Sequence, residues 1–445
     1  MEERLSKFGV FSLVVGSIIG WGSFTLPGTS FLNSSGVVNT TIGLIIGGLL
    51  VIAIQYGYKI MLREHISEGG EFSYTYENLG ERHGFIVGWS LILCYLSLVP
   101  LNALAYVLLF RKIFGPSISQ VFLYNFAGYD VFLSDIALAS FVIILFAWIN
   151  IRGLKLSSRI QNFMSVALVI VVFALFFYMA FAMDSVSFKD NYLSNYNFSF
   201  KDISLVVAIV PFLFVGFDVV PQVSTELNFK PEKADRVTII AIVFGVLLYA
   251  MLNSIAAFNF SPVEAVADEW AVGSSVIKST GMFGFSFLVV ALWAAVTGGI
   301  NGFMISSSRL LGALSRYGMA PESLGKKNLK GIYSNAIVFI TGISLIGPWI
   351  GREVIIYIVD MSSLLAAIVY TYVAGISFGK AKSKLEKNMS NIARLSGLLF
   401  ISLLVLPFSP SRLSTNSFVF LVVWITLGLI FYTGKKNVKN LGGLS

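Results

Sequence analysis

The chain has 445 residues, of which 56% are hydrophobic and only 12% are charged, and its mean hydropathy is +0.82. Because a soluble domain is roughly 45–50% apolar and about 25% charged, this composition excludes an ordinary soluble protein and indicates an integral membrane protein. The net charge of +8 does not indicate a nucleic acid partner, since the basic residues follow a loop pattern typical of proteins in a lipid bilayer.

Apolar runs long enough to span a bilayer, which needs ~20 residues, recur about twelve times along the chain. The first run is too long for the hydrophobic part of a signal peptide and ends without a small-residue cleavage site, so we expect it to remain as a spanning helix. The spans are predicted near residues 8–31, 40–62, 84–110, 132–150, 160–183, 203–223, 237–260, 281–308, 332–350, 353–379, 391–409 and 416–434.

Lysine and arginine concentrate in alternate loops and at the chain ends, which is the positive-inside pattern. The pattern predicts a multi-pass protein of the cell (plasma) membrane whose N- and C-termini are both cytoplasmic. The basic clusters lie at 152–159, 230–236, 325–330, 379–387 and 435–439.

The first span contains "VVGSIIGWGSF" at residues 14–24, which is poor material for a continuous membrane helix. The sixth span has Gly216 near its centre, with Pro211 and Pro221 on either side. Glycine and proline can simply allow close packing or a kink. Interrupted spans at matching positions of two halves, however, are typical of transporters built from inverted repeats.

Five spans separate the two interruptions, and this odd offset means that the halves enter the membrane in opposite directions. The sequence therefore predicts an all-α membrane protein with a 5+5 inverted repeat and broken helices 1 and 6. We expect a transporter core at 1–390, with repeats at about 8–183 and 203–379, followed by two additional helices and a cytoplasmic tail at 391–445.

A broken helix exposes main-chain groups that can serve as ligands in a cavity. Amides at a helix start favour an anion, and carbonyls favour a cation or an ammonium group. A site with both suits a zwitterion such as an amino acid, whereas a site with one suits a simple amine or acid. The expected amides belong to Trp21, Gly22 and Ser23, and the expected carbonyls to Ser17, Ile18, Phe212 and Val215.

Two carboxylates fall inside apolar spans: Asp218 next to the sixth-span break, and Asp360 in the tenth span. Ionisable groups at such depth are typical of proton relays and ion sites, although each could instead cap a helix end or clamp two helices. Asn102 is a further polar residue at mid-depth and a candidate for lining the pocket. Phe212, Phe217 and Phe303 could form aromatic lids or could simply pack in the core.

Five segments resemble the amino acid–polyamine–organocation superfamily of transporters, which has the leucine-transporter fold. The segments, in chain order, are "VGSIIGWGSFTLPG", "SEGGEFSYTYENLG", "NIRGLKLSSRIQN", "FVGFDVVPQVSTELNFKPEK" and "NGFMISSSRLLGALSRYGMAP".

The resemblance implies a carboxylate site at the Gly20-Trp21-Gly22 turn and an aromatic gate at Phe212. It also implies an acid linked to pH response at Asp218 and a residue that stacks on the substrate at Phe303. The bundle of spans one, two, six and seven would rock against a scaffold of spans three, four, eight and nine.

Two positions depart from the family pattern. Trp21 stands where the residue between the glycines is usually small, so its ring either turns away or narrows the pocket. Leu168 stands where some proton-driven relatives carry a fifth-helix lysine, which excludes coupling through that lysine. Protons linked to Asp218, sodium or plain exchange remain as coupling modes.

We therefore expect a secondary active transporter that moves a small amino acid by alternating access. A polyamine or other organocation transporter and a non-transporting nutrient sensor are the alternatives; a channel would need a pore motif that the sequence lacks. We expect no enzyme, no cofactor and no metal site, because His65 and His83 are the only histidines and Cys94 is the only cysteine.

Overall fold

The computed structural model describes residues 4–126, 128–194, 196–268 and 270–442 of an all-α membrane protein. Among these residues, ten helices are long and apolar enough to cross a membrane, and the count is eleven if the bent pair Lys7–Ile18 and Trp21–Ser35 forms one span. The predicted fold class is confirmed in this respect. The count of about twelve spans and the inverted repeat stay predictions.

The elements, with η for 3₁₀ turns and for the π-helical η1, are these in chain order: α1 (Lys7–Ile18), α2 (Trp21–Leu26), η1 (Pro27–Phe31), α3 (Leu32–Ser35), α4 (Val38–Glu64), α5 (Gly70–Leu79), α6 (Glu81–Phe114), η2 (Pro116–Ile118), β1 (Phe122–Phe126), β2 (Tyr129–Phe132), α7 (Leu133–Arg152), α8 (Leu154–Ala182), α9 (Ser185–Tyr192), α10 (Phe200–Leu213), α11 (Val219–Gln222), η3 (Ser224–Glu226), η4 (Pro231–Lys233), α12 (Ala234–Ala257), α13 (Pro262–Ala267), α14 (Ala271–Arg316), η5 (Glu322–Gly325), α15 (Ser334–Ser344), α16 (Gly347–Lys380), α17 (Lys384–Val405) and α18 (Thr415–Gly442).

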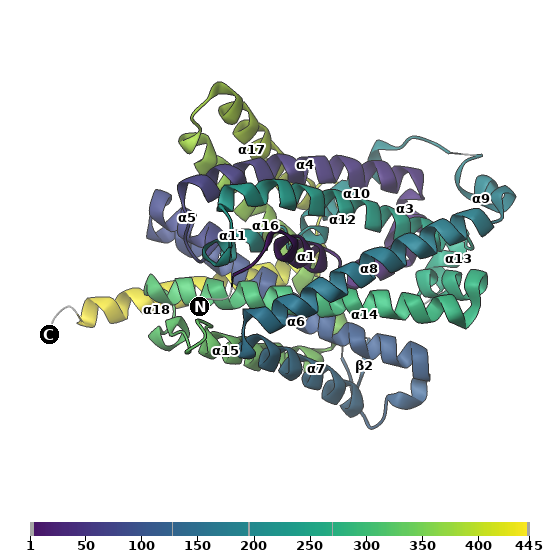
Figure 1. Ribbon diagram of the computed structural model, residues 1–445, viewed down its shortest axis with the longest axis horizontal. Coiled ribbons are helices and arrows are strands. Elements are labelled where there is room, and N and C mark those ends of the chain that lie inside the picture. Colours follow the sequence, from purple (N-terminus) through teal and green to yellow (C-terminus); the bar gives the residue numbers. More distant parts are fainter. Residues whose placement is uncertain (1–3, 127, 195, 269, 443–445) are drawn as a thin grey trace.

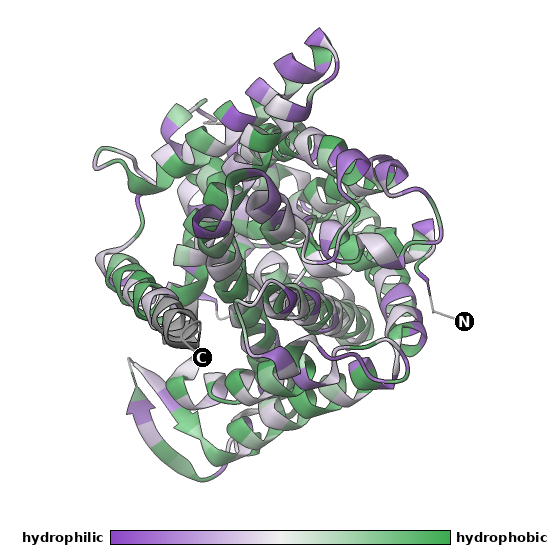
Figure 2. Ribbon diagram, turned by 90° about the vertical axis from the view of Figure 1, so that its left-hand side faces the viewer, coloured by the Kyte–Doolittle hydropathy of each residue, from purple (hydrophilic) through white to green (hydrophobic). Residues whose placement is uncertain are grey.

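The long helices run side by side, with connecting elements at both ends of the molecule (Figure 1). At one end lie α5, α11 and the chain termini, and at the other lie α3, α9 and α13. Viewed from the first end, most helices carry hydrophobic residues along their length (Figure 2). Exposed apolar side chains such as Phe163, Ile170 and Phe181 cover the outer side of α8. This exposure fits a bilayer, because the outer side chains of a membrane protein contact lipid tails and not water.

The basic loops meet at the end that holds α5 and α11, which we call the basic face. This clustering is what the alternating charge pattern predicts. Contacts that join these loops to neighbouring elements include Lys59–Asp235, Arg63–Glu386, Lys382–Glu64, Lys327–Glu68, and the Lys330 ammonium donating to the Arg152 carbonyl.

The centre of the molecule is formed by α1, α6 and α14. In the most apolar stretch of α6, 83% of the residues are buried, whereas in that of α18 only 17% are buried. Helix α18 is therefore peripheral. Close packing of α1 on α14 depends on glycine: a Cβ on Gly298 would lie 2.9 Å from the Cα of Gly16. Gly281 in α14 and Gly351 in α16 have non-helical backbones, so each of these long elements consists of two helices joined at a kink.

One element lies outside the sequence prediction. β1 and β2 form an antiparallel hairpin between α6 and α7, with Asn125 opposite Asp130. The Tyr124 hydroxyl donates to the Trp349 carbonyl, which ties this hairpin to the kinked region between α15 and α16.

Candidate functional site

The first span is interrupted where the sequence has Ile19 and Gly20. Helix α1 ends at Ile18, Ile19 and Gly20 have extended backbones, and α2 begins at Trp21 after a bend of 49°. The side chain of Asn102, from α6, lies in this gap and accepts a hydrogen bond from the Trp21 amide at 3.4 Å. A Cβ on Gly20 would lie 3.0 Å from the same Asn102 oxygen, so a larger residue would crowd it.

The sixth apolar run is not a continuous helix, because α10 ends at Leu213 and α11 begins only at Val219. Gly216 has φ = +125°, a conformation that favours glycine. A Cβ there would lie 2.6 Å from the Cβ of Ser17 and 2.8 Å from its carbonyl carbon. The absence of a side chain at Gly216 therefore allows the two interruptions to touch.

Asp218 holds the second interruption in place. Its Oδ1 accepts a hydrogen bond from the Gly216 amide at 2.7 Å, and its Oδ2 accepts one from the Tyr95 hydroxyl of α6 at 2.9 Å. The residue is 1% exposed and does not line the cavity described below. Asp218 thus acts at least as a cap for the free amide of the break.

Tyr249 of α12 links the two interruptions from a third element. Its hydroxyl lies 3.2 Å from the Ile18 carbonyl and 3.4 Å from the Leu213 carbonyl, so it can donate to either one. Nothing in the sequence marks Tyr249, since a tyrosine in an apolar helix carries no distinguishing pattern.

A small cavity of about 30 Å³ lies between the two interruptions. Among the residues predicted to bind substrate, all but Ser23, Gly216 and Phe217 line it. Leu98, Leu101, Leu213 and Tyr249 are lining residues that the sequence analysis missed. The complete lining is Ser17, Ile18, Gly20, Trp21, Gly22, Leu98, Leu101, Asn102, Phe212, Leu213, Val215, Tyr249 and Phe303.

The remaining predicted residues lie next to this cavity rather than in its wall. The Ser23 hydroxyl and amide both donate to the Gly20 carbonyl, at 2.7 and 3.2 Å, which stabilises the first turn of α2. Phe217 is buried, and its ring packs on those of Tyr58 and Tyr370 at centroid distances of 5.3 and 5.1 Å.

A larger cavity of about 690 Å³ lies on the side away from the basic face. Trp21 and Phe212 line both this outer cavity and the small one, so their rings stand between the two spaces. Asp360 lines the outer cavity, where Ser417 of α18 is its hydrogen-bond partner at 3.5 Å. The structure therefore separates Asp360 from Asp218 and places each in a different environment.

The basic face carries ion pairs between elements of the predicted bundle and elements of the predicted scaffold. Glu226, just after α11, receives two hydrogen bonds from the guanidinium of Arg309 in α14, at 2.9 and 3.1 Å. The backbone of Leu5 pairs with that of Glu226 and Asn228, so the N-terminal segment covers the same region.

Glu68, in the loop between α4 and α5, is the centre of a second cluster. Its carboxylate contacts Arg316, Lys327 and Tyr333. Burial raises the pKa of Glu68, but the hydrogen bonds from Lys327, Tyr333 and Arg316 outweigh burial and bring its pKa to about 2. Glu68 is therefore ionised at neutral pH.

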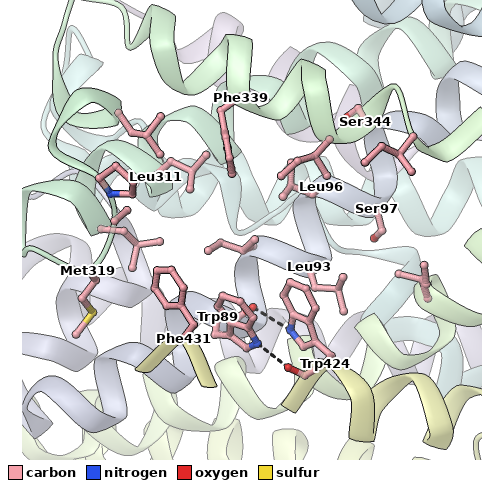
Figure 3. Close-up of a pocket in the computed structure, with 18 of the residues that line it drawn as sticks. Trp89, Leu93, Leu96, Ser97, Leu311, Met319, Phe339, Ser344, Trp424 and Phe431 are labelled. Carbon is pink, nitrogen blue, oxygen red and sulfur yellow. Dashed lines mark hydrogen bonds between the residues drawn. The ribbon is translucent and has the colours of Figure 1, made fainter. Parts of the chain in front are cut away.

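A second cavity of about 690 Å³ lies between α6, α14, α15, α16 and α18 and has an almost entirely apolar wall (Figure 3). Trp89 and Trp424 stack at its edge and exchange hydrogen bonds between indole nitrogens and main-chain carbonyls, at 3.0 and 3.3 Å. Among the residues whose side chains the structure describes, neither those at the two interruptions nor any charged one lines this cavity. It is therefore no candidate for holding a charged or zwitterionic solute.

Comparison with known proteins identifies the group to which the chain is similar. The model of the amino acid permease family matches residues 5–431. A branched-chain amino acid permease (BcaP) of Bacillus subtilis is 25% identical, with 97% of this chain and 92% of the relative covered.

Two further relatives show the range of proteins with similar sequences. The methylthioribose transporter of Bacillus subtilis is 25% identical over 97% of this chain and 93% of its own length. The human large neutral amino acids transporter small subunit 2 is 23% identical, with 74% of this chain and 61% of the relative covered. These relatives are transporters, which confirms the expectation that the chain is no enzyme. Because the family model covers nearly all of the sequence, the chain belongs to the amino acid permease family.

Proposed function

We propose that the protein is a secondary active transporter for a small neutral amino acid, which binds in the cavity between the two interruptions. One observation carries the proposal: the wall of that cavity holds main-chain groups of both interruptions, and the described residues that line it include no ionisable side chain except the phenol of Tyr249. A zwitterion without net charge fits such a wall, since its ammonium and carboxylate can each meet main-chain groups.

The composition of the wall also favours one substrate class over another. Leu98, Leu101 and Val215 provide apolar contacts, and Phe303 adds an aromatic face. A polyamine would bring several buried positive charges that no carboxylate in the wall compensates, which is costly. The names of two relatives, which refer to branched-chain and large neutral amino acids, agree with a neutral amino acid.

The carboxylate of the substrate would bind near the start of α2. The Trp21 amide is already bonded to Asn102, so a carboxylate there would compete with the Asn102 oxygen or share the amides of the first turn with it. The small volume of the cavity means that Trp21 or Phe212 must move to admit a substrate. We therefore assign the aromatic gate to these two rings.

Transport would proceed by alternating access in the plasma membrane, with the basic face toward the cytoplasm. The bundle consists of α1–α2, α4, α10–α11 and α12, and the scaffold includes α6, α7, α14 and α15. The ion pairs Glu226–Arg309 and Glu68–Arg316 join bundle to scaffold at the basic face, so this arrangement is the one closed toward the cytoplasm. Opening of that face would separate these pairs.

We assign proton coupling to Asp218, which touches both the broken helix and the scaffold residue Tyr95. Asp360 is the second candidate, because it lies in the outer cavity through which a proton or an ammonium group would pass. Sodium coupling and plain exchange are the competing modes.

The first experiment measures the melting temperature of the purified protein in the presence of amino acids, polyamines, methylthioribose and organic acids. A ligand at a hundred times its dissociation constant adds about 2.7 kcal/mol of stability. We expect stabilisation by neutral amino acids; stabilisation by amines alone would contradict the proposed substrate class.

Uptake of the stabilising ligand into proteoliposomes then separates a transporter from a sensor, since a sensor binds without moving its ligand. The variant Asp218→Asn should retain binding and lose the pH dependence of uptake. If Asp218→Asn keeps the wild-type pH profile, the proton role of Asp218 is wrong.

A further inference from the structure

A second buried carboxylate lies next to Asp218 on the side of the basic face. Glu71, in the first turn of α5, is 0% exposed, and its Oε2 accepts a hydrogen bond from the Gln222 side chain at 2.7 Å. Gly69 and Gly70 bring α5 to this position: both have positive φ, and a Cβ on Gly70 would lie 2.7 Å from Pro221. Glu71 is therefore held directly against the second half of the broken sixth span.

The groups around the Glu71 carboxyl include no cation. Gln222 of the broken span donates to it, and the titratable groups that interact with it electrostatically are Tyr58 of α4, Tyr74 of α5, Cys94 and Tyr95 of α6, Tyr370 of α16 and Asp218. Among the described residues no lysine, arginine or histidine pairs with Glu71 or Asp218. Two neighbouring buried carboxylates without a counter-charge cannot both be ionised at low cost, so the pair binds a proton.

The hydrogen bonds indicate which carboxyl holds that proton. Asp218 accepts bonds from an amide and a hydroxyl on both of its oxygens, which favours the ionised form. Glu71 Oε1 has no hydrogen-bond partner among the described residues, and neither do the neighbouring Gln222 Oε1 and the Tyr58 hydroxyl. Protonated Glu71 would donate to one of these acceptors and satisfy an otherwise unpaired group. Burial, and after it the charge of Asp218, also raises the pKa of Glu71 well above its ordinary value.

We propose that Glu71 carries the coupling proton between Asp218 and the cytoplasm. The proton leaves the carboxyl of Asp218 and binds the carboxylate of Glu71, so one carboxylate and one carboxylic acid are present before and after the step. The hydroxyl of Tyr58, which interacts electrostatically with both carboxyls, would relay the proton by accepting it while donating its own. When the basic face opens, Glu71 releases its proton to water. This role rests on the proposed transport function, but it adds a residue outside the substrate cavity.

The variant Glu71→Gln tests this role because it keeps the shape of the side chain and imitates the protonated form. In proteoliposomes it should still exchange internal for external substrate, since exchange needs no net release of a proton. It should lose substrate accumulation driven by a proton gradient. The control is Glu77→Gln, which lies in the same helix but pairs with His65.

The outcomes distinguish this inference from the proposed function. If wild-type protein moves no amino acid, the proposed function fails. If wild-type protein accumulates substrate and Glu71→Gln does so equally, only the role of Glu71 fails. If accumulation never depends on a proton gradient, the roles of Glu71 and Asp218 in proton coupling both fail, while amino acid transport stands. Loss of exchange together with accumulation in Glu71→Gln, in a variant that still binds substrate, would also overturn the role, because it would show a structural need for the carboxylate.

Infrared spectroscopy tests the resting proton without transport. The wild-type protein at neutral pH should show the C=O band of a buried carboxylic acid. That band should be absent from Glu71→Gln and present in Asp218→Asn. Its persistence in Glu71→Gln, or its loss only in Asp218→Asn, would place the proton on Asp218 and refute the assignment.

Discussion

The pair Glu226–Arg309 provides a direct test of how the basic face stays closed. The Arg309 side chain is 2% exposed and that of Glu226 is 16% exposed, so this is a largely buried ion pair with two hydrogen bonds. The variant Glu226→Gln keeps the shape and removes the charge, which leaves the guanidinium buried and uncompensated in the closed form. Breaking such a pair costs about 3–5 kcal/mol. Opening lets water reach Arg309, so most of this cost falls on the closed state.

A shift of about 3 kcal/mol changes the ratio of open to closed protein more than a hundredfold. A cysteine in place of Ser12, which is fully buried in α1 against α8, can report the open fraction. The native Cys94 is also buried and would be changed to alanine in the background. Glu226→Gln should increase the rate at which a thiol reagent labels the new cysteine in nanodiscs by up to this factor.

The matched control for the labelling experiment is Glu232→Gln, a few residues further along the same segment. Glu232 makes no ion pair within the described part of the chain, so its neutralisation should leave labelling unchanged. An equal rate in Glu226→Gln and wild-type protein, with both still folded, would refute the idea that this ion pair holds the basic face closed.

Further predictions concern single positions. Gly216→Ala should abolish uptake and lower the melting temperature, because strain at positive φ costs about 1–3 kcal/mol and the new Cβ would press on Ser17. The control is Gly375→Ala, whose Cβ would meet nothing within 4 Å and which should change neither uptake nor the melting temperature. The pKa of Glu68 is lowered to about 2, so its ion pairs stabilise closure above the ordinary glutamate value of 4.5 and are lost as the pH falls toward 2. Its two cationic partners, Arg316 and Lys327, are 42% and 40% exposed, so water weakens these ion pairs. We therefore expect them to stabilise the closed state by only about 1–2 kcal/mol. The labelling rate is divided by that of a freely exposed cysteine at the same pH, because only the thiolate reacts. The normalised rate should rise below pH 4.5 in wild-type protein, whereas it should be high already at neutral pH in Glu68→Gln; identical normalised profiles would contradict this. Ser344→Ala removes a buried hydroxyl without a hydrogen-bond partner among the described residues, and should raise the melting temperature by about 1–2 °C. A melting temperature below that of the wild-type protein would mean that the hydroxyl makes a hydrogen bond in the membrane.

Sequence patterns predicted the membrane class and the places where the first and sixth apolar runs are interrupted. Both interruptions fall at glycine, where the main chain leaves the helix without a clash of side chains. Gly216 could be singled out because glycine suits both a backbone conformation that other residues avoid and a close approach to a neighbouring segment. Main-chain breaks of this kind can be predicted from one sequence, because they depend on glycine at a particular position.

The side-chain network around the interruptions could not be predicted in the same way. Asn102 was a candidate for lining the pocket, but its bond to the Trp21 amide depends on how α6 crosses α2. Tyr249 and Glu71 were not identified, because the first sits in an ordinary apolar helix and the second in a polar segment that looks exposed. Their burial results from tertiary packing, in particular from the close approach of Gly70 to Pro221.

The positions of the carboxylates suggest how a change of conformation would reach the proton. Asp218 and Glu71 both belong to the bundle and its adjoining α5, so they stay together when the bundle moves. The Tyr95 hydroxyl, by contrast, belongs to the scaffold helix α6 and donates to Asp218 in this arrangement, so movement of the bundle against the scaffold would break the bond. A hydrogen bond to a charged group contributes about 1.5–3 kcal/mol. Its loss on opening would raise the free energy of ionised Asp218 by that amount, while water would reach Glu71 from the cytoplasm. In the closed arrangement the Tyr95 bond would thus favour passage of the proton from Asp218 to Glu71, and opening would then expose Glu71 to the cytoplasm, which would couple proton flow to alternating access without a lysine at Leu168.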